Sequence, residues 1–67
     1  MKGFIEVTAD NGTHLLNVKH IEDVWKDKDG KCTIFIAFNI PNAVEQDYVI
    51  PYESYDEIKR RIEEATR

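Results

Sequence analysis

The sequence predicts an α+β fold: about five short antiparallel strands, in a small sheet or an open barrel-like roll, followed by one C-terminal α-helix. Three observations carry this prediction. Runs of β-branched and aromatic residues recur between residues 3 and 50, turn signals separate them, and a helix-capping motif opens the last segment. The chain has 67 residues, the size of one small domain, so we expect residues 1–67 to form a single domain.

The N-terminal segment is expected to form a β-hairpin. Residues 3–8 are rich in strand-forming side chains and alternate in part between apolar and polar. Residues 10–12, Asp-Asn-Gly, are a strong turn signal, because Asn and Gly tolerate positive φ. Residues 13–17 should return as the second strand. A short connector at residues 18–20 then leads into a third strand at residues 21–26.

The central strand is expected at residues 31–38, after a second turn at residues 27–30 that closes on Gly30. One face of this strand carries Cys32, Ile34, Ile36 and Phe38. The other face carries Thr33, Phe35 and Ala37 and is also free of charge. A strand with one solvated face should alternate apolar with polar residues, so the second face is expected to be covered.

Residues 39–46 are expected to form a loop, longer than a tight hairpin turn, that carries Ile40 and Val44. A last strand should occupy residues 47–51. Pro51 would end its hydrogen-bonded ladder, because proline has no amide hydrogen to donate.

The C-terminal helix is expected to begin at Ser54 and to run to about residue 65. Ser54 and Glu57 have the spacing of a capping box, in which each side chain accepts from the amide of the other residue. Tyr55, Ile58, Ile62 and Ala65 recur at helical spacing, so this face should dock on the sheet. The expected core pairs Tyr55, Ile58 and Ile62 with Ile5, Val7, Ile34, Ile36 and Ile50. The charged residues suggest three i,i+4 ion pairs: Asp56–Arg60, Glu57–Arg61 and Glu63–Arg67.

No residue pattern indicates catalysis, a cofactor or a metal site. His14, His20 and Cys32 match no metal-ligand spacing, and Ser54, the only serine, is accounted for as a helix cap. The three glycines are scattered and form no phosphate-binding loop. We therefore expect a protein that is not an enzyme, with Cys32 as a small core hydrophobe.

The charge balance restricts the classes of partner. Thirteen acids against nine bases give a net charge of −4, which argues against an extensive surface for nucleic acid or for an anionic membrane. The longest uncharged stretch, residues 32–44, is too short to span a bilayer. With no signal peptide visible and a lone cysteine, the cytoplasm is the expected location.

An apolar surplus is the main functional signal. Small domains often need a disulfide, a metal or a second subunit, and one cysteine excludes an internal disulfide. More apolar residues are present than one sheet face and one helix can cover, and such residues are typical of interfaces. The alternative is a sheet that curls into a roll and buries them itself. The expected interaction surface comprises Trp25, Phe35, Ala37, Ile40 and Val44.

The chain resembles the FlbD-type family of small flagellar-operon proteins. The resemblance rests on residues 5–8, Asn11-Gly12, residues 16–22, and Tyr48-Val49-Ile50 leading into residues 53–58. It implies a small regulatory or assembly role, with transcription suspected. The order of elements is also similar to the core of LytTR-type DNA-binding domains, whose basic reading surface has no counterpart in this sequence.

The function predicted is therefore a non-catalytic cytoplasmic interaction or regulatory module that forms a homodimer through an apolar sheet face and offers a surface to a further protein. The alternative is a nucleic-acid-associated transcriptional regulator that uses Lys59, Arg60 and Arg61, the only run of three bases. Salt dependence separates the two, because nucleic-acid affinity falls steeply as salt rises.

Overall fold

The computed structural model describes residues 2–40 and 43–67, and for residues 38–40 and 43–46 it describes the strands but not the side chains. The described residues form five strands, one α-helix and a single 3-10 turn, which confirms the predicted α+β class. In chain order the elements are β1 (Phe4–Ala9), β2 (Gly12–Asn17), η1 (Val18–His20), β3 (Ile21–Lys26), β4 (Cys32–Ile40), β5 (Ala43–Val49) and α1 (Tyr55–Ala65).

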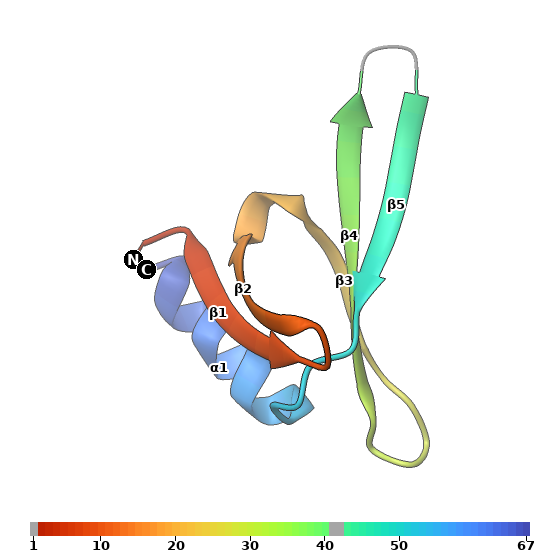
Figure 1. Cartoon of the computed structure of the whole chain (residues 1–67). Helices are drawn as coiled ribbons and strands as arrows, with labels where there is room; N and C mark the ends of the chain where they lie inside the picture. Colours follow the sequence, from red (N-terminus) through yellow and green to blue (C-terminus); the bar gives the residue numbers. More distant parts are fainter. Residues whose placement is uncertain (1, 41–42) are drawn as a thin grey trace.

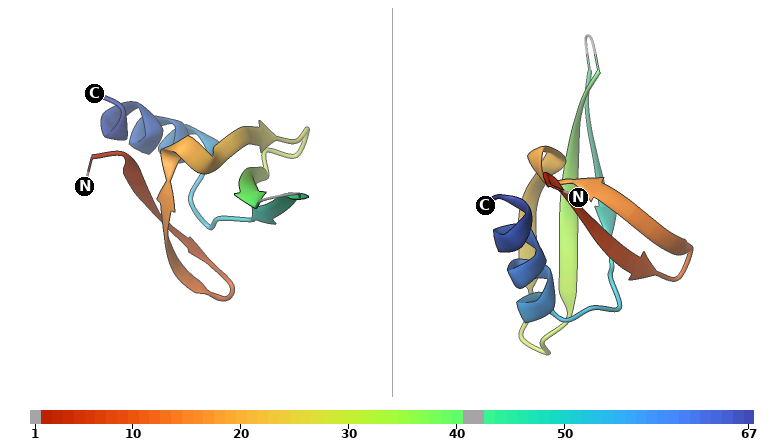
Figure 2. Two further views of the ribbon diagram at one scale, coloured as in Figure 1. Left: turned by 90° about the horizontal axis from the view of Figure 1, so that it is seen from above. Right: turned by 90° about the vertical axis from the view of Figure 1, so that its left-hand side faces the viewer.

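The strands are divided between two antiparallel sheets. β1 pairs with β2 as a hairpin, while β3, β4 and β5 form a second sheet with β4 in the centre. The hairpin and α1 lie on one side of the three-stranded sheet, and β4 and β5 extend past the rest of the chain (Figure 1). The two further views agree with this arrangement (Figure 2). The β3–β4–β5 sheet therefore has an inner face toward the hairpin and helix, and an outer face turned away from both.

Local turn chemistry fixes the two predicted turns. Gly12 has a φ of +122°, which a side chain would strain, and it faces Ala9 at the closed end of the first hairpin. In the second turn the Asp27 carboxylate accepts hydrogen bonds from the amides of Asp29 and Lys31, both at 2.9 Å. A short polar side chain that bonds backbone ahead of it is a typical turn device.

The prediction of a loop at residues 39–46 is wrong. Asn39 and Ile40 belong to β4, residues 43–46 belong to β5, and Ile40 lies opposite Ala43 in the ladder. Hairpin strands can be joined by as few as two residues, so the strand-forming residues on either side remain free to pair. Residues 41 and 42 of the expected loop lie outside the described residues.

The core lies between the inner face of β4, the inner face of β1 and the helix. The buried residues agree with most of the predicted core, including Cys32 as a small core hydrophobe; they are Ile5, Val7, Cys32, Ile34, Ile36, Ile58 and Ala65. Tyr55 and Ile62 pack against this cluster and are partly buried. The helix therefore docks with the face that its apolar spacing predicts.

Ile50 is the exception among the predicted core residues, because its side chain is 41% exposed. β5 ends one residue earlier, at Val49, which lies opposite Ile34 and packs against the core. Side chains alternate between the two faces of a strand, so the residue after Val49 is directed away from the core. Beyond it the chain leaves the sheet, and the amide of Tyr52 donates to the carbonyl of Thr8 at 2.7 Å.

The helix begins as predicted, but its capping box is only half formed. Ser54 is the N-cap, and its hydroxyl accepts a hydrogen bond from the amide of Glu57 at 3.1 Å. The Glu57 carboxylate accepts instead from Arg60 and Arg61. A charged guanidinium forms a stronger hydrogen bond with a carboxylate than a neutral amide does, which explains the exchange.

Two isoleucines provide a matched test of this core. Ile34 is fully buried and Ile50 is 41% exposed. We expect Ile34→Ala to lower the free energy of unfolding by about 2–5 kcal/mol, because it leaves a cavity at the centre of the core. Ile50→Ala should cost less than about 1 kcal/mol. Urea denaturation measures both values, and equal losses would show that the core has been placed incorrectly.

Candidate interaction surface

The outer face of the β3–β4–β5 sheet carries a group of uncharged side chains, most of them apolar, which we call the aromatic face. Because Ile34 is buried on the inner face, its neighbours Thr33 and Phe35 point outward. Directly opposite residues share a face, so Trp25 opposite Thr33 and Tyr48 opposite Phe35 also point outward. The aromatic face thus consists of Trp25, Thr33, Phe35, Ala37 and Tyr48. The exposed Asp23 lies opposite Phe35 on β3 and borders this group.

No other element of the described chain covers the aromatic face. Trp25 is 51% exposed and Tyr48 is 59% exposed. Phe35 lies between them on the central strand, half-buried, with its ring centroid 6.5 Å from that of Tyr48. The hairpin and α1 both lie on the opposite side of the sheet (Figure 2). The chain therefore leaves these aromatic residues uncovered instead of curling its sheet over them.

The structure brings together three of the five residues predicted for an interaction surface. Trp25, Phe35 and Ala37 share the aromatic face. Ile40 and Val44 belong to β4 and β5, but their side chains lie outside the described residues. Tyr48, which is not among the five residues predicted for the surface, joins it because β5 pairs along β4.

In the basic run of the helix, residues 59–61, both arginines form ion pairs with glutamates. Arg60 forms ion pairs with Glu57 and Glu64, and Arg61 forms ion pairs with Glu57 at 2.7 Å and with Glu53 at 3.1 Å. The Glu57–Arg61 pair was expected, whereas Arg60 uses Glu57 and Glu64 in place of Asp56. Among the described contacts, Lys59 alone of the three bases has no acidic partner.

Glu53 and Arg61 also close the outer edge of β1. The amide of Thr8 donates to the Glu53 carboxylate at 3.0 Å, and Arg61 donates to the carbonyl of Glu6 at 2.6 Å. The amide of Tyr52 donates a hydrogen bond to the carbonyl of Thr8. These contacts satisfy backbone groups that point away from β2, and they tie α1 to the hairpin.

Hydrogen bonds and ion pairs with the two arginines lower the pKa values of two carboxyl groups, Glu57 and Glu53. Hydrogen bonds from Arg60 and then Arg61 lower the pKa of Glu57 from its ordinary 4.5 to about 2. Partial burial alone would raise the pKa of Glu53, but the Thr8 amide and the Arg61 charge outweigh it and lower that pKa. Both groups therefore favour the folded state when they are ionised.

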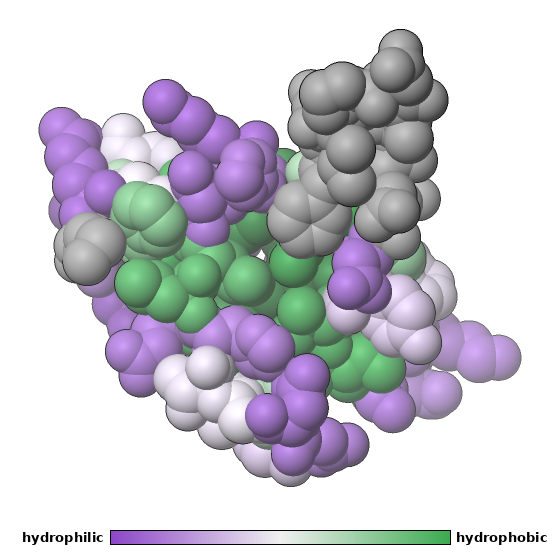
Figure 3. All heavy atoms as spheres, turned by 45° about the horizontal axis from the view of Figure 1, so that its top comes forward, coloured by the Kyte–Doolittle hydropathy of each residue, from purple (hydrophilic) through white to green (hydrophobic). Residues whose placement is uncertain are grey.

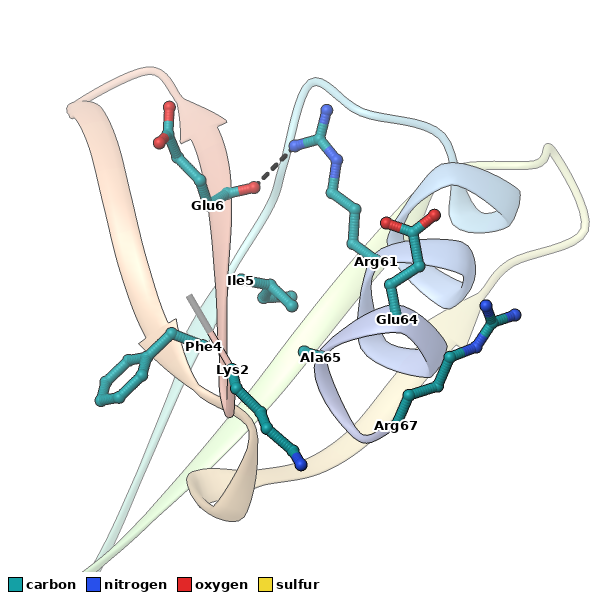
Figure 4. A pocket seen from close by; sticks show the side chains of 8 residues that line it. All are labelled: Lys2, Phe4, Ile5, Glu6, Arg61, Glu64, Ala65 and Arg67. Atoms are coloured by element: carbon teal, nitrogen blue, oxygen red, sulfur yellow. Dashed lines mark hydrogen bonds between the residues drawn. The ribbon is translucent and has the colours of Figure 1, made fainter.

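A hollow of about 410 Å³ lies between β1 and the end of α1 (Figure 4). Ile5 and Ala65 face one another between the two elements, while Phe4 points away from them. Charged side chains of both signs line the rest: Lys2, Glu6, Arg61, Glu64 and Arg67. Among the described residues, those that line the hollow include no serine, cysteine or histidine.

Two other potentially reactive side chains, Cys32 and His14, belong to different sheets. Burial raises the pKa of the Cys32 thiol, which disfavours the reactive thiolate. His14 on β2 shares a hydrogen bond of 2.7 Å with Asn11 in the adjacent turn. Within residues 2–40 and 43–67, no three His, Cys, Asp or Glu side chains form a group that could hold a metal ion. Nor does the described part of the chain contain a helix long and apolar enough to cross a membrane.

Comparison with family models, with curated proteins and with solved structures finds no match for this chain. The resemblance to FlbD-type proteins therefore stays a prediction.

Sequence reasoning missed one exposed residue, Leu15, which is 55% exposed on β2. The signal was present in the pair Leu15-Leu16. Adjacent residues of a strand point to opposite faces, so only one of these leucines can reach the core. Leu16 packs against the core, and Leu15 does not.

Acid should destabilise the helix, because it protonates Glu57 and so weakens ion pairs within α1. Because the pKa of Glu57 is lowered, its contribution to stability is complete above about pH 4.5 and is lost as the pH falls toward 2. We expect the melting temperature of the wild type to fall across this window, and that of Glu57→Gln to fall less. Glu63→Gln is the matched control, because Glu63 lies on the same helix without an ion pair among the described contacts. Parallel curves for Glu57→Gln and the wild type would contradict the assignment.

Proposed function

We propose that the protein is a non-catalytic cytoplasmic interaction or regulatory module that forms a dimer through its aromatic face. One observation carries the proposal: Trp25 and Tyr48, each more than half exposed, share with Phe35 a face that the chain leaves uncovered. Interface cores are enriched in such aromatic residues, which often dominate binding energy. A buried, unpaired Cys32 suits a reducing compartment.

The exposed area of the chain supports association. The accessible surface is 5018 Å², whereas a monomer of 7.8 kDa is expected to expose about 4400 Å². The radius of gyration is 12.0 Å, against about 11 Å for a compact chain of this length. The excess of roughly 600 Å² agrees with the extension of β4 and β5 past the rest of the chain and with the uncovered aromatic face.

A nucleic-acid-associated regulator receives less support from the geometry. Arg60 and Arg61 are held by Glu53, Glu57 and Glu64, so a phosphate would have to displace carboxylates already in place. Only Lys59 of this stretch presents an uncommitted charge among the described contacts. Phosphate binding requires several such charges together.

Removing Trp25 should weaken self-association. We expect light scattering to give a mass above that of the monomer for the wild type at micromolar concentrations. Trp25→Ser should raise the dissociation constant of the contact through the aromatic face by at least about 30-fold, as expected for an interface tryptophan worth about 2 kcal/mol. Because the contact is apolar, it should persist as sodium chloride is increased.

Tyr52→Ser is the matched control for this measurement. Tyr52 is also an exposed aromatic residue, at 68%, but it lies beyond β5, where its hydroxyl donates to Asp10. This variant should associate like the wild type. A Trp25→Ser variant that is indistinguishable from the wild type would refute the proposed face. Salt-sensitive binding of duplex DNA that Lys59→Ala weakens would favour the regulator instead.

A further inference from the structure

The outward edge of β2 is an unpaired strand edge. On β1, the backbone groups of Glu6 and Thr8 bond to partners on the side away from β2. In the antiparallel register Glu6 lies opposite Leu15 and Thr8 lies opposite Thr13. In an antiparallel ladder, two directly opposite residues either bond to each other or both direct their backbone groups away from each other. The amides and carbonyls of Leu15 and Thr13 therefore point away from β1. Within the described part of the chain, nothing bonds to them.

The other three strand edges are protected. Glu53, Tyr52 and Arg61 occupy the edge of β1. β3 contains a register shift between Ile21 and Asp23 and carries several charges along its length. On β5 the Asp47 carboxylate accepts from the amide of Tyr48 at 2.7 Å. Bulges, charges and covering segments are the usual means by which proteins block edge pairing.

β2 has none of these protections. Its sequence, Gly12–Asn17, contains no charged residue and no proline, and its pairing with β1 runs without a shift. Leu15, at 55% exposure, lies in the middle of the edge. β1 separates β2 from α1, so the free edge faces away from the helix (Figure 2). An unprotected apolar edge of this kind is a site for strand addition.

An apolar hollow adjoins this edge. About 300 Å³ in volume, it is lined by Phe4, Leu15, Leu16, Asn17, His20 and Ile36. Hydrophobic residues gather across the same region, between the hairpin and the three-stranded sheet (Figure 3). A strand added to β2 would therefore also exclude water from apolar surface, which strengthens the contact beyond its backbone hydrogen bonds.

We propose that β2 pairs with β2 of a second copy of this chain, antiparallel about a two-fold axis that passes beside Leu15. In this register Leu15 lies opposite Leu15 of the second copy, and the two residues exchange amide-to-carbonyl hydrogen bonds. Thr13 lies opposite Asn17 of the second copy. The two hairpins then form one continuous four-stranded sheet, and both exposed leucines lie side by side on its surface.

Charge favours a second copy as the occupant. The paired segment is neutral in a chain whose net charge is −4, so the acids of the two copies are kept away from the contact. In an antiparallel pairing, the end of β2 that follows Asp10 lies beside the end of the second copy's β2 that precedes Lys19. An acidic residue of one copy and a basic residue of the other thus flank each end of the contact, as expected for a self-complementary interface.

This inference rests on the proposed self-association but adds a separate contact. The aromatic face lies on the outer side of the β3–β4–β5 sheet, whereas the edge of β2 belongs to the hairpin on its inner side. The two contacts can therefore be removed one at a time. The Trp25→Ser variant isolates the β2 contact, because it lacks the largest side chain of the aromatic face.

A proline in the middle of the edge tests the pairing. In Trp25→Ser, adding Leu15→Pro removes the amide that the second copy would use. That amide points away from β1, so the hairpin keeps its own ladder. Leu15→Thr is the control, because it also removes the leucine but keeps the amide. We expect Leu15→Pro to weaken association about 10- to 100-fold relative to Leu15→Thr by light scattering. Matching thermal melts should show that both variants fold.

Charge reversal then tests the identity of the partner. Leu15→Lys and Leu15→Glu should each abolish pairing alone, because like charges would face each other across the two-fold axis. An equimolar mixture should restore pairing. A mixture that stays monomeric overturns the proposed register.

The outcomes separate this inference from the proposed function. If Trp25→Ser is monomeric while the wild type is dimeric, the β2 contact is wrong and the aromatic face stands. If Leu15→Pro alone makes the chain monomeric and Trp25→Ser does not weaken association, the aromatic-face contact is wrong and the β2 contact stands. A monomeric wild type overturns both.

Discussion

The β3–β4–β5 sheet has two apolar faces, and the chain provides cover for only one of them. One hairpin and one helix occupy the inner face, where Ile34 and Ile58 are fully buried. Nothing in the described chain remains for the outer face, so Trp25 and Tyr48 stay more than half exposed. This constraint follows from size, because a chain this short buries only about 60% of the surface exposed on unfolding. The large accessible area and the open edge of β2 have the same origin.

The contacts that attach the helix also decide which edge of the hairpin stays open. Glu53, Tyr52 and Arg61 occupy the outward backbone groups of β1, so α1 and the segment before it are fixed against that strand. The opposite edge, on β2, receives no equivalent cover. Because Arg61 is used in this way, and Arg60 is held by Glu57 and Glu64, the helix has little free positive charge. One set of interactions thus stabilises the fold, leaves a neutral edge open and weakens the case for nucleic-acid binding.

Local patterns were sufficient to predict most of the fold. The alternation of Ile34 and Ile36, the Asn11-Gly12 turn and the Ser54 cap each report a neighbourhood of a few residues, and the structure agrees with them. The errors occur where pairing between distant segments decides the outcome. Ile50 was expected in the core because it is apolar, but β5 ends at Val49. The expected loop at residues 39–46 forms mainly strand because β4 and β5 pair to the end of the hairpin. The split into two sheets, like the open edge of β2, depends on partners that no local pattern identifies.

The reactive side chains and the exposed apolar side chains of the described residues are distributed differently over the fold. Within the described chain, Cys32 is buried, His14 bonds to its own turn, and the hollow beside α1 is lined by charges of both signs. None of these supplies a nucleophile and a base held together in a dry site, which acid–base or covalent catalysis requires. The exposed apolar groups, by contrast, lie on regular strands whose backbone is already ordered. Binding through them would order few additional residues, which lowers one of the entropic costs of association.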